Sequence, residues 1–231
     1  MFTKKTLKKY ESQIMECVEM YGHTPVEDLK ICISNGNKKV GSIPNISLPP
    51  IKTCPHCERC CRECYDIKAN LQYSNVRLAR ARNYSILTRN PELYWGQLRS
   101  NLARKRKLTH FRFHVGGDMT SPEYFEKMVK TARMFPKCIF WTYTKAHFIV
   151  NEFVRSHGGS IRSAIPGNLR IMFSAWDGME FDNPFGFGSF IVVDEGQKPP
   201  KGVWHCTGDC GKCIKANRGC PVGETAWVWK H

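Results

Sequence analysis

Long apolar runs are missing from this sequence. No segment has the run of roughly 18 apolar residues that a membrane-spanning helix requires. The N-terminus, MFTKKTLKKYESQIMECVEMYGH, starts with basic residues, but acidic and polar residues interrupt it where a signal peptide needs an unbroken apolar core. Both absences argue against a membrane protein or a secreted one. We therefore expect a cytoplasmic protein with no membrane partner.

Acidic residues are scarce. The chain has 20 Asp and Glu against 35 Lys and Arg, which gives a net charge of +15. Glu92 is the single acid between Arg77 and Lys107, a basic stretch that ends in ARKRK. Such a stretch suits a polyanion, because neutralising phosphates releases counterions, although a solvated helix face explains it equally well. We expect nucleic-acid contacts, without base-specific readout, from Arg104, Lys105, Arg106 and Lys107.

Cysteine, by contrast, is abundant. The chain has 12, of which five lie in residues 54–64 and four in residues 206–220. A chain of 231 residues is long enough to fold without a covalent staple. In a reducing cytoplasm, clustered cysteines bind metals more often than they form disulfides. The predicted ligands are Cys54, Cys57, Cys60, Cys61, Cys64, Cys206, Cys210, Cys213 and Cys220.

Alternating strands and helices follow the first cysteine cluster. Periodicity and capping residues predict strands at residues 110–115, 138–144, 169–174 and 189–194, and helices at 121–135 and 146–157. This order is typical of a parallel sheet. At this length it favours an α/β fold built as a partial (β/α) barrel of about five or six mostly parallel strands. We expect an N-terminal helical segment (1–35), the barrel with the cysteine loop (36–198) and a cysteine-rich extension that binds metal (199–231).

Three helices are expected before the sheet begins. Residues 1–21 have apolar residues near helical spacing. Ser74 can cap a second helix, and Asn90 can cap a third that has Pro91 at its first position.

The strand HFRFHV predicts two different faces. Phe111, Phe113 and Val115 should face packing helices, which leaves a polar set on the opposite face. That set is His110, Arg112 and His114. Because barrel interiors are mostly apolar, these residues predict a wet interior that lines a ligand site.

The first cysteine cluster contains a C-x3-C-x2-C spacing at Cys57, Cys61 and Cys64. Three thiolates can hold three irons of a [4Fe-4S] cluster and leave the fourth iron free. The short extended segment GSIPNISLPPIK before the cysteines counts as a first strand, so VGGDM follows the second, HFRFHV. With VGGDM in that place, the cysteine spacing resembles the signature of radical S-adenosylmethionine enzymes.

This resemblance implies S-adenosylmethionine as a further cofactor, its reductive cleavage to a radical, and an electron donor such as flavodoxin or ferredoxin. It assigns Gly116, Gly117 and Asp118 to that cofactor. Lys145 and Ser174, at the ends of expected strands, are further cofactor-binding candidates.

The chain departs from the radical S-adenosylmethionine pattern at several residues. Glu63 stands where the superfamily usually has an aromatic residue, and the acid after the two glycines is Asp118 rather than Glu. Cys54 or Cys60 could supply a fourth ligand and close the cluster. A closed cluster transfers electrons but does not bind the cofactor at iron.

A second resemblance covers more of the chain, from about residue 35 onward. The segments CYDIKA, GGDM, FWTYTKA and MFSAWDGM, with the cysteine-rich tail, are similar to the phage gene product 88 family. This resemblance implies the architecture and a phage origin, which would place the protein in the host cytoplasm. It leaves the chemistry open.

Zinc is the alternative metal. C-x2-C pairs such as Cys54/Cys57, Cys61/Cys64 and Cys210/Cys213 suit tetrahedral zinc, but five crowded cysteines exceed what one zinc ion uses. The tail offers four thiols, which saturate either zinc or a second cluster and predict a structural site or an electron relay.

Two functions follow from these patterns. The first is an iron–sulfur enzyme, radical-S-adenosylmethionine-like, that acts on a nucleic acid or nucleotide. The second is a non-catalytic zinc or iron–sulfur module that binds nucleic acid.

Overall fold

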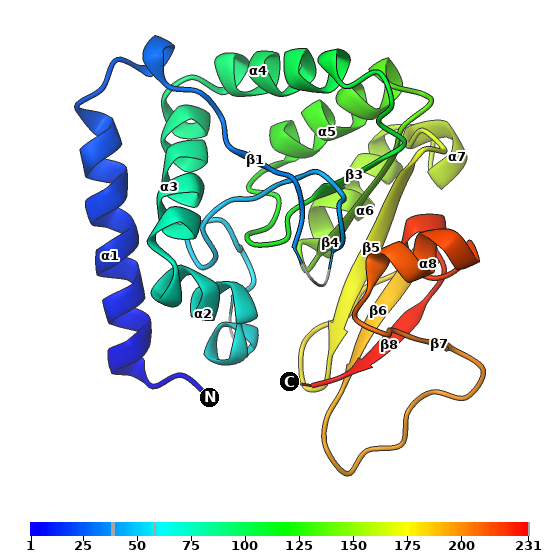
Figure 1. Ribbon diagram of the computed structural model, residues 1–231. Helices are drawn as coiled ribbons and strands as arrows, with labels where there is room; N and C mark the ends of the chain where they lie inside the picture. The colour runs from blue at the N-terminus through cyan, green and yellow to red at the C-terminus, as the bar shows by residue number, and fades with distance from the viewer. Residues whose placement is uncertain (38–39, 58, 231) are drawn as a thin grey trace. The chain divides into compact units, whose positions relative to one another are not determined.

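The computed structural model describes residues 1–37, 40–57 and 59–230 (Figure 1). Within these residues, no helix has the length and apolar character needed to cross a membrane. The chain divides into two compact units. The first comprises Met1–Ser34, Ile46–Leu108 and His114–Gly117, and the second comprises Asn35–Asn45, Thr109–Phe113 and Asp118–His231.

The first unit is mainly helical. Its elements are α1 (Lys4–Gly22), η1 (Val26–Asp28), β1 (Ile33–Ser34), η2 (Cys60–Glu63), α2 (Tyr65–Gln72), α3 (Ser74–Arg89) and α4 (Pro91–Arg104). Helices α1 and α3 lie side by side (Figure 1). The buried face of α1 places Tyr10 and Ile14 in the core, where the Tyr10 hydroxyl donates to the Pro50 carbonyl oxygen at 3.0 Å.

Local capping residues explain where these helices begin. The expected helix at 1–21 is confirmed as α1, and the Asn90 side chain accepts from the Leu93 N–H at 3.0 Å at the start of α4, with Pro91 in the first turn. The expected cap at Ser74 is wrong, because Ser74 is the first residue of α3 and Tyr73 occupies the capping position without a side-chain capping hydrogen bond. The helix nevertheless begins within one residue of the expected start.

The second unit is built on a parallel sheet. Its strands are β3 (His110–Phe113), β4 (Ile139–Thr144), β5 (Leu169–Trp176), β6 (Gly188–Val193), β7 (Trp204–His205) and β8 (Ala226–Trp229). They follow the order β3-β4-β5-β6-β8-β7, and every pair in this series is parallel. The two-residue strand β2 (Asn45–Ile46) lies at the boundary of the two units, and the Pro44 carbonyl oxygen before it accepts from the Arg112 N–H at 3.0 Å.

This strand order confirms the α/β class and the parallel strands, but it does not confirm a barrel. A barrel requires the first and last strands to pair, whereas the strand β7 ends this series. The sheet is therefore open. The three-part domain division stays a prediction, and residues 204–205 and 226–229 of the expected extension form strands of the sheet.

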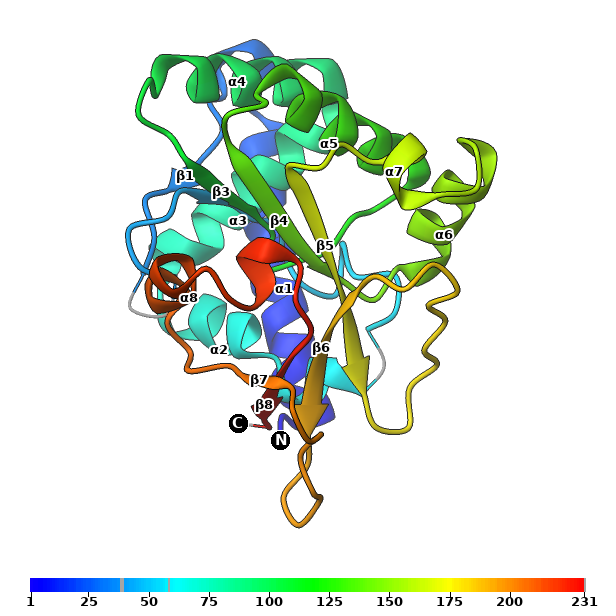
Figure 2. The same cartoon turned by 90° about the vertical axis from the view of Figure 1, so that its right-hand side faces the viewer.

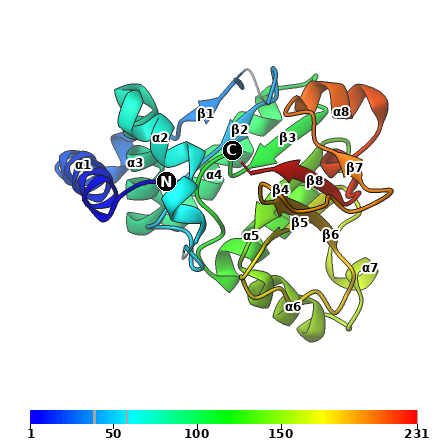
Figure 3. The same cartoon turned by 90° about the horizontal axis from the view of Figure 1, so that it is seen from below.

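The two faces of this sheet carry different layers. Helices α5 (Pro122–Met134), α6 (His147–Ser156) and α7 (Ile161–Ala164) cover one face, and α8 (Cys210–Ala216) lies over the other (Figures 2 and 3). The 3-10 turn η3 (Cys220–Val222) contacts β4 and β5. The tail that carries the last four cysteines therefore covers the face of the sheet opposite α5 and α6.

Aromatic packing fills the face toward α5 and α6. Phe111, Phe113 and Phe140 are fully buried, with ring centroids 5.3 to 5.9 Å apart. The expected alternation of β3 is thus confirmed for these phenylalanines, and Arg112 lies half-buried on the opposite face.

His114 differs from the expectation. It follows the strand, is 3% exposed and has a φ of 55°. The turn after β3 therefore takes His114 out of the alternating pattern that would have placed it beside His110 and Arg112.

Candidate metal centres

Three thiols of the cysteine loop lie together in the first unit. The loop follows Thr53 and continues through η2 into α2. The Cys57 thiol hydrogen-bonds with Cys54 and with Cys60. These hydrogen bonds, and then burial, raise the pKa of Cys57 well above the usual range of a thiol, which keeps it protonated at neutral pH.

Cys64 lies at the N-terminal end of α2. Its sulfur accepts backbone N–H groups of Ile67 and Asp66, which favours the thiolate. Burial is the larger effect and, with the nearby Asp66 carboxylate, raises the pKa of Cys64 to about 12. Cys54 also lies close enough to Cys64 to disfavour its ionisation.

The thiols that neighbour one another follow a spacing other than C-x3-C-x2-C. Cys54, Cys57, Cys60 and Cys64 follow the pattern C-x2-C-x2-C-x3-C. Cys61, a member of the expected set with Cys57 and Cys64, is 8% exposed and lies in η2 beside Cys60. Which of the five cysteines bind a metal stays a prediction.

A buried ion pair lies directly after the cysteine loop. Asp66 is 2% exposed, and its carboxylate accepts from the Arg80 guanidinium at 3.0 Å and from the Asn70 side-chain amide at 3.1 Å. Arg80 therefore compensates the carboxylate that stands nearest to Cys64. Sequence analysis did not find this pair because its two residues lie on different helices, α2 and α3.

Gly116 and Gly117 pack tightly in the first unit. A Cβ at Gly116 would lie 1.8 Å from the Asp66 carboxylate oxygen. Gly117 has a φ of 79°, and a Cβ there would lie 2.6 Å from the Thr53 hydroxyl and 2.8 Å from the Leu48 carbonyl oxygen. These contacts account for both glycines without a cofactor. Their assignment to S-adenosylmethionine stays a prediction.

Asp118, Lys145 and Ser174 gather at the carboxyl-terminal edge of the sheet in the second unit. The Asp118 carboxylate accepts the backbone N–H groups of Met119 at 2.7 Å and Lys145 at 2.9 Å. The Lys145 ammonium lies 5.4 Å from the Trp176 ring centroid, and the Trp176 indole donates to Ser174 Oγ at 3.2 Å. Burial raises the pKa of Asp118, while these backbone donors oppose the shift.

The four tail cysteines also lie near one another, in the second unit. Cys206 follows β7, Cys210 and Cys213 lie on α8, and Cys220 begins η3. Cys206 is close enough to disfavour ionisation of each of the other three. Asp209 caps α8 by accepting from the Gly211 N–H at 2.9 Å, which holds the helix that carries two of the thiols.

Two side chains of the sheet contact these tail thiols. The Arg112 guanidinium hydrogen-bonds with the sulfur of Cys210 and lies 4.5 Å from the Tyr143 ring centroid. The Tyr143 hydroxyl hydrogen-bonds with Cys220. Sequence analysis placed Arg112 on this face of the sheet but gave no signal for Tyr143, because the partner thiols follow it by more than 60 residues.

All 12 cysteines are free of disulfides. Among residues 1–37, 40–57 and 59–230, no three His, Cys, Asp or Glu side chains already converge as a metal ion would require. Within each set the thiols are therefore close to one another, and a bound metal would have to draw them closer still. Sulfur is the right donor for zinc and for iron–sulfur clusters, so the chemistry of both sets fits such a group.

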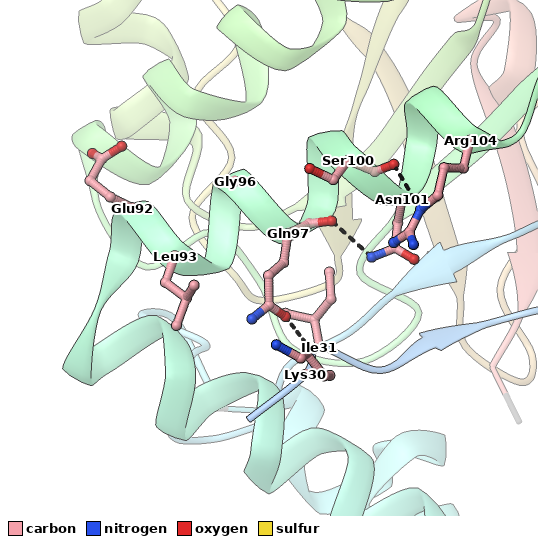
Figure 4. Close-up of a pocket in the computed structure, with 9 residues that line it drawn as sticks. All are labelled: Lys30, Ile31, Glu92, Leu93, Gly96, Gln97, Ser100, Asn101 and Arg104. Atoms are coloured by element: carbon pink, nitrogen blue, oxygen red, sulfur yellow. Dashed lines mark hydrogen bonds between the residues drawn. The ribbon is translucent and has the colours of Figure 1, made fainter. Parts of the chain in front are cut away.

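The predicted basic segment, residues 104–107, begins at the last residue of α4 in the first unit. Arg106 and Lys107 are exposed, Lys105 is half-buried, and the Arg104 guanidinium donates to the Ser100 carbonyl oxygen at 3.3 Å. Arg104 also lines an open groove of about 720 Å³ along α4, together with Lys30 (Figure 4). The Gln97 side chain of α4 ties this helix to the segment around Lys30 on the other side of the groove. It accepts from the Ile31 N–H at 2.8 Å and donates to the Leu29 carbonyl oxygen at 2.8 Å.

Fold and sites together define an α/β protein with an open parallel sheet and two gatherings of cysteine thiols. The chain belongs to the gene product 88 family, a phage protein family whose model matches residues 27–216. No curated protein and no solved structure matches this chain. These comparisons give no support to the resemblance to radical S-adenosylmethionine enzymes.

Proposed function

We propose that this chain is an iron–sulfur protein in which the cysteine loop holds one [4Fe-4S] cluster. The observation that carries the proposal is the position of the Cys57 thiol, which hydrogen-bonds with both Cys54 and Cys60. Cys64 is the fourth ligand, since it neighbours Cys54 and its sulfur accepts two backbone N–H groups. The bound cluster would supply one-electron transfer.

The residues around the loop suit this role. The Asp66–Arg80 pair offsets the carboxylate that would otherwise oppose a thiolate at Cys64. Backbone N–H groups at the start of α2 favour that thiolate. A reducing host cytoplasm, in which thiols are not oxidised to disulfides, is the expected location.

Cysteine substitutions test this ligand assignment. We expect Cys57→Ala to remove the iron and sulfide of the loop cluster from anaerobically purified protein, because it removes the central thiol of the set. Cys61→Ala is the matched control, a cysteine of the same loop that is expected to retain iron and sulfide. Absorbance spectra with iron, sulfide and zinc analysis measure both variants.

Two results would contradict the assignment. Protein that is colourless and loaded with zinc would establish the zinc alternative. Equal loss of iron in Cys57→Ala and Cys61→Ala would restore the expected set of Cys57, Cys61 and Cys64.

S-adenosylmethionine binding is a narrower proposal that requires an iron without a cysteine ligand. If Cys64 is not a ligand, the loop leaves one iron open, and Cys64→Ala retains the cluster. Adding dithionite and S-adenosylmethionine to reduced protein and looking for 5′-deoxyadenosine then tests the activity. Absence of that product in cluster-loaded protein would leave an electron-transfer or structural role.

Nucleic acid is the partner that the basic surface favours. Arg106 and Lys107 are exposed beside the groove that Lys30 and Arg104 line. Their charges can contact a phosphate backbone without reading bases. Such contacts with nucleic acid are compatible with both candidate functions, the iron–sulfur protein and the zinc module.

A further inference from the structure

A cation is held against sulfur in the second unit. The Arg112 guanidinium lies over the Tyr143 ring at 4.5 Å and hydrogen-bonds with the Cys210 sulfur. Arg112 and Tyr143 come from neighbouring strands, β3 and β4, and point to the face that the tail covers. The sheet thus fixes the guanidinium while α8 brings the sulfur to it.

The Tyr143 hydroxyl is a second donor toward the same thiols. The hydroxyl hydrogen-bonds with Cys220 at the start of η3, and this 3-10 turn contacts β4, the strand that carries Tyr143. Cys220 itself is 5% exposed, so the thiol has little access to water as an alternative partner.

Charge explains why such donors are needed. Four thiolates around Zn²⁺, or around a [4Fe-4S] cluster with a 2+ core, give a centre with a net charge of about −2. A buried anion of that size is costly unless a cation or hydrogen-bond donors compensate it.

We propose that Cys206, Cys210, Cys213 and Cys220 form a four-thiolate metal centre for which Arg112 and Tyr143 are positioning residues. Arg112 compensates the charge at Cys210, and Tyr143 orients Cys220. Each thiol that binds releases its proton to solvent, so the site takes up the metal as thiolate. The inference concerns the second unit and does not depend on iron in the cysteine loop.

Cobalt binding by the full chain tests this inference. Co²⁺ is the probe, because its thiolate charge-transfer absorbance reports sulfur ligands directly, and Cys57→Ser with Cys60→Ser removes the loop site from the measurement. Arg112→Gln and Tyr143→Phe are expected to weaken Co²⁺ binding about 10- to 100-fold. They should also move the charge-transfer bands to longer wavelength, because a thiolate without its donor gives up electron density more easily.

A matched control separates this role from a general loss of packing. Arg170 lies on β5, in register with Trp141, and its side chain packs near Gly223. Arg170→Gln is expected to leave both the affinity and the band positions unchanged. Arg112→Lys keeps the charge but loses the fork-shaped donor, so we expect intermediate affinity; this variant and Tyr143→Phe also provide the test if Arg112→Gln fails to fold.

Three outcomes would overturn the inference. These are no Co²⁺–thiolate bands in the background protein, no band shift in Arg112→Gln or Tyr143→Phe, and equal effects of Arg112→Gln and Arg170→Gln. Titration with Zn²⁺ and reconstitution with iron and sulfide then identify the native metal, and either metal bound through all four cysteines supports the centre. Failure of the loop cluster would leave these results unaffected.

Discussion

At the scale of single residues, buried charges define both gatherings of thiols. Asp66 meets Arg80 beside the cysteine loop, and Arg112 meets the sulfurs of the tail. Each of these charged groups is partly or wholly buried. Burying a charge costs free energy unless a partner compensates it. In the tail, the partner we propose for Arg112 is a set of thiolates.

Asp118 gives a pH prediction at this scale. Burial raises its pKa above the ordinary value of 3.8, so the folded state favours the protonated carboxyl. Its contribution to stability is therefore present below the ordinary value and is lost as the pH rises through the raised one. We expect the free-energy difference between wild type and Asp118→Asn to shrink as the pH increases from about 4 to about 7.

Urea unfolding of both proteins across that range measures the difference. Asp118→Asn should also cost about 1 to 3 kcal/mol near pH 4, because one of the backbone N–H groups of Met119 and Lys145 loses its acceptor. A difference that stays constant with pH would show that Asp118 does not titrate differently on folding.

The sequence predicted part of this residue-scale arrangement. Alternation in HFRFHV correctly placed Arg112 away from the packing helices. It could not supply the partner, because Cys210 follows by 98 residues and meets Arg112 only through the fold. The sequence also supplied the candidate cysteines of the loop. It could not show which thiols neighbour Cys57, because that depends on the path of the loop.

At the scale of elements, close packing explains the two adjacent glycines. Gly116 leaves space for the Asp66 carboxylate at the start of α2, and the Tyr65 hydroxyl donates to the carbonyl oxygen of Val115 just before it. The segment after β3 and the N-terminal turn of α2 are thus packed without room for a side chain at position 116.

Replacing Gly116 tests this packing. A Cβ at Gly116 would stand 1.8 Å from the Asp66 carboxylate oxygen, so we expect Gly116→Ala to destabilise the protein by about 3 kcal/mol or more. Gly96→Ala is the matched control, since a Cβ at Gly96 of α4 meets nothing within 4 Å. That change should stabilise the helix by up to about 1 kcal/mol.

Chemical denaturation of the two variants compares them directly. If Gly116→Ala is as stable as wild type, Asp66 must be free to move, and the account of the glycine pair fails.

Helices with caps were predicted well, and short elements were not. Asn90 and Ser121 each accept a backbone N–H at the start of a helix, as their positions before a proline predict. Strand β7 has two residues, too few for a periodic pattern, and β8 is the apolar run AWVW, which does not alternate with polar residues. Helix α8 has only seven residues, and its two cysteines were interpreted by the spacing of possible metal ligands, so the helix was not predicted.

At the scale of the whole molecule, strand pairing decides between a barrel and an open sheet. The alternation of strands and helices predicts parallel strands for both architectures. Closure depends on whether the terminal strands pair, which local patterns do not encode. The parallel direction was therefore predictable. The number of strands, eight in the described residues against the five or six expected, and the open sheet were not.

The net charge of +15 gives a prediction for the molecule as a whole. Replacing Arg104, Lys105, Arg106 and Lys107 with Ala should reduce the salt dependence of binding to a DNA duplex by up to about 3.5 in the slope of log K against log salt. The matched control replaces the four exposed lysines of α1, Lys4, Lys5, Lys8 and Lys9, which changes the net charge equally.

Fluorescence titration at several salt concentrations gives both slopes. A larger effect at residues 104–107 supports a local interface at the end of α4. Equal reductions would mean that binding follows net charge, and an unaltered slope would place the polyanion site elsewhere.

The order β6-β8-β7 has a consequence for biosynthesis. Strand β8, made after β7, lies between β6 and β7, and the Cys206 N–H bonds to the Trp227 carbonyl oxygen of β8 at 2.7 Å. While a ribosome still covers residues 226–229, β7 has no neighbour to join. We therefore expect the proposed four-thiolate centre to form only after those residues emerge, so a nascent chain stalled before them should remain open to proteases and lack that centre.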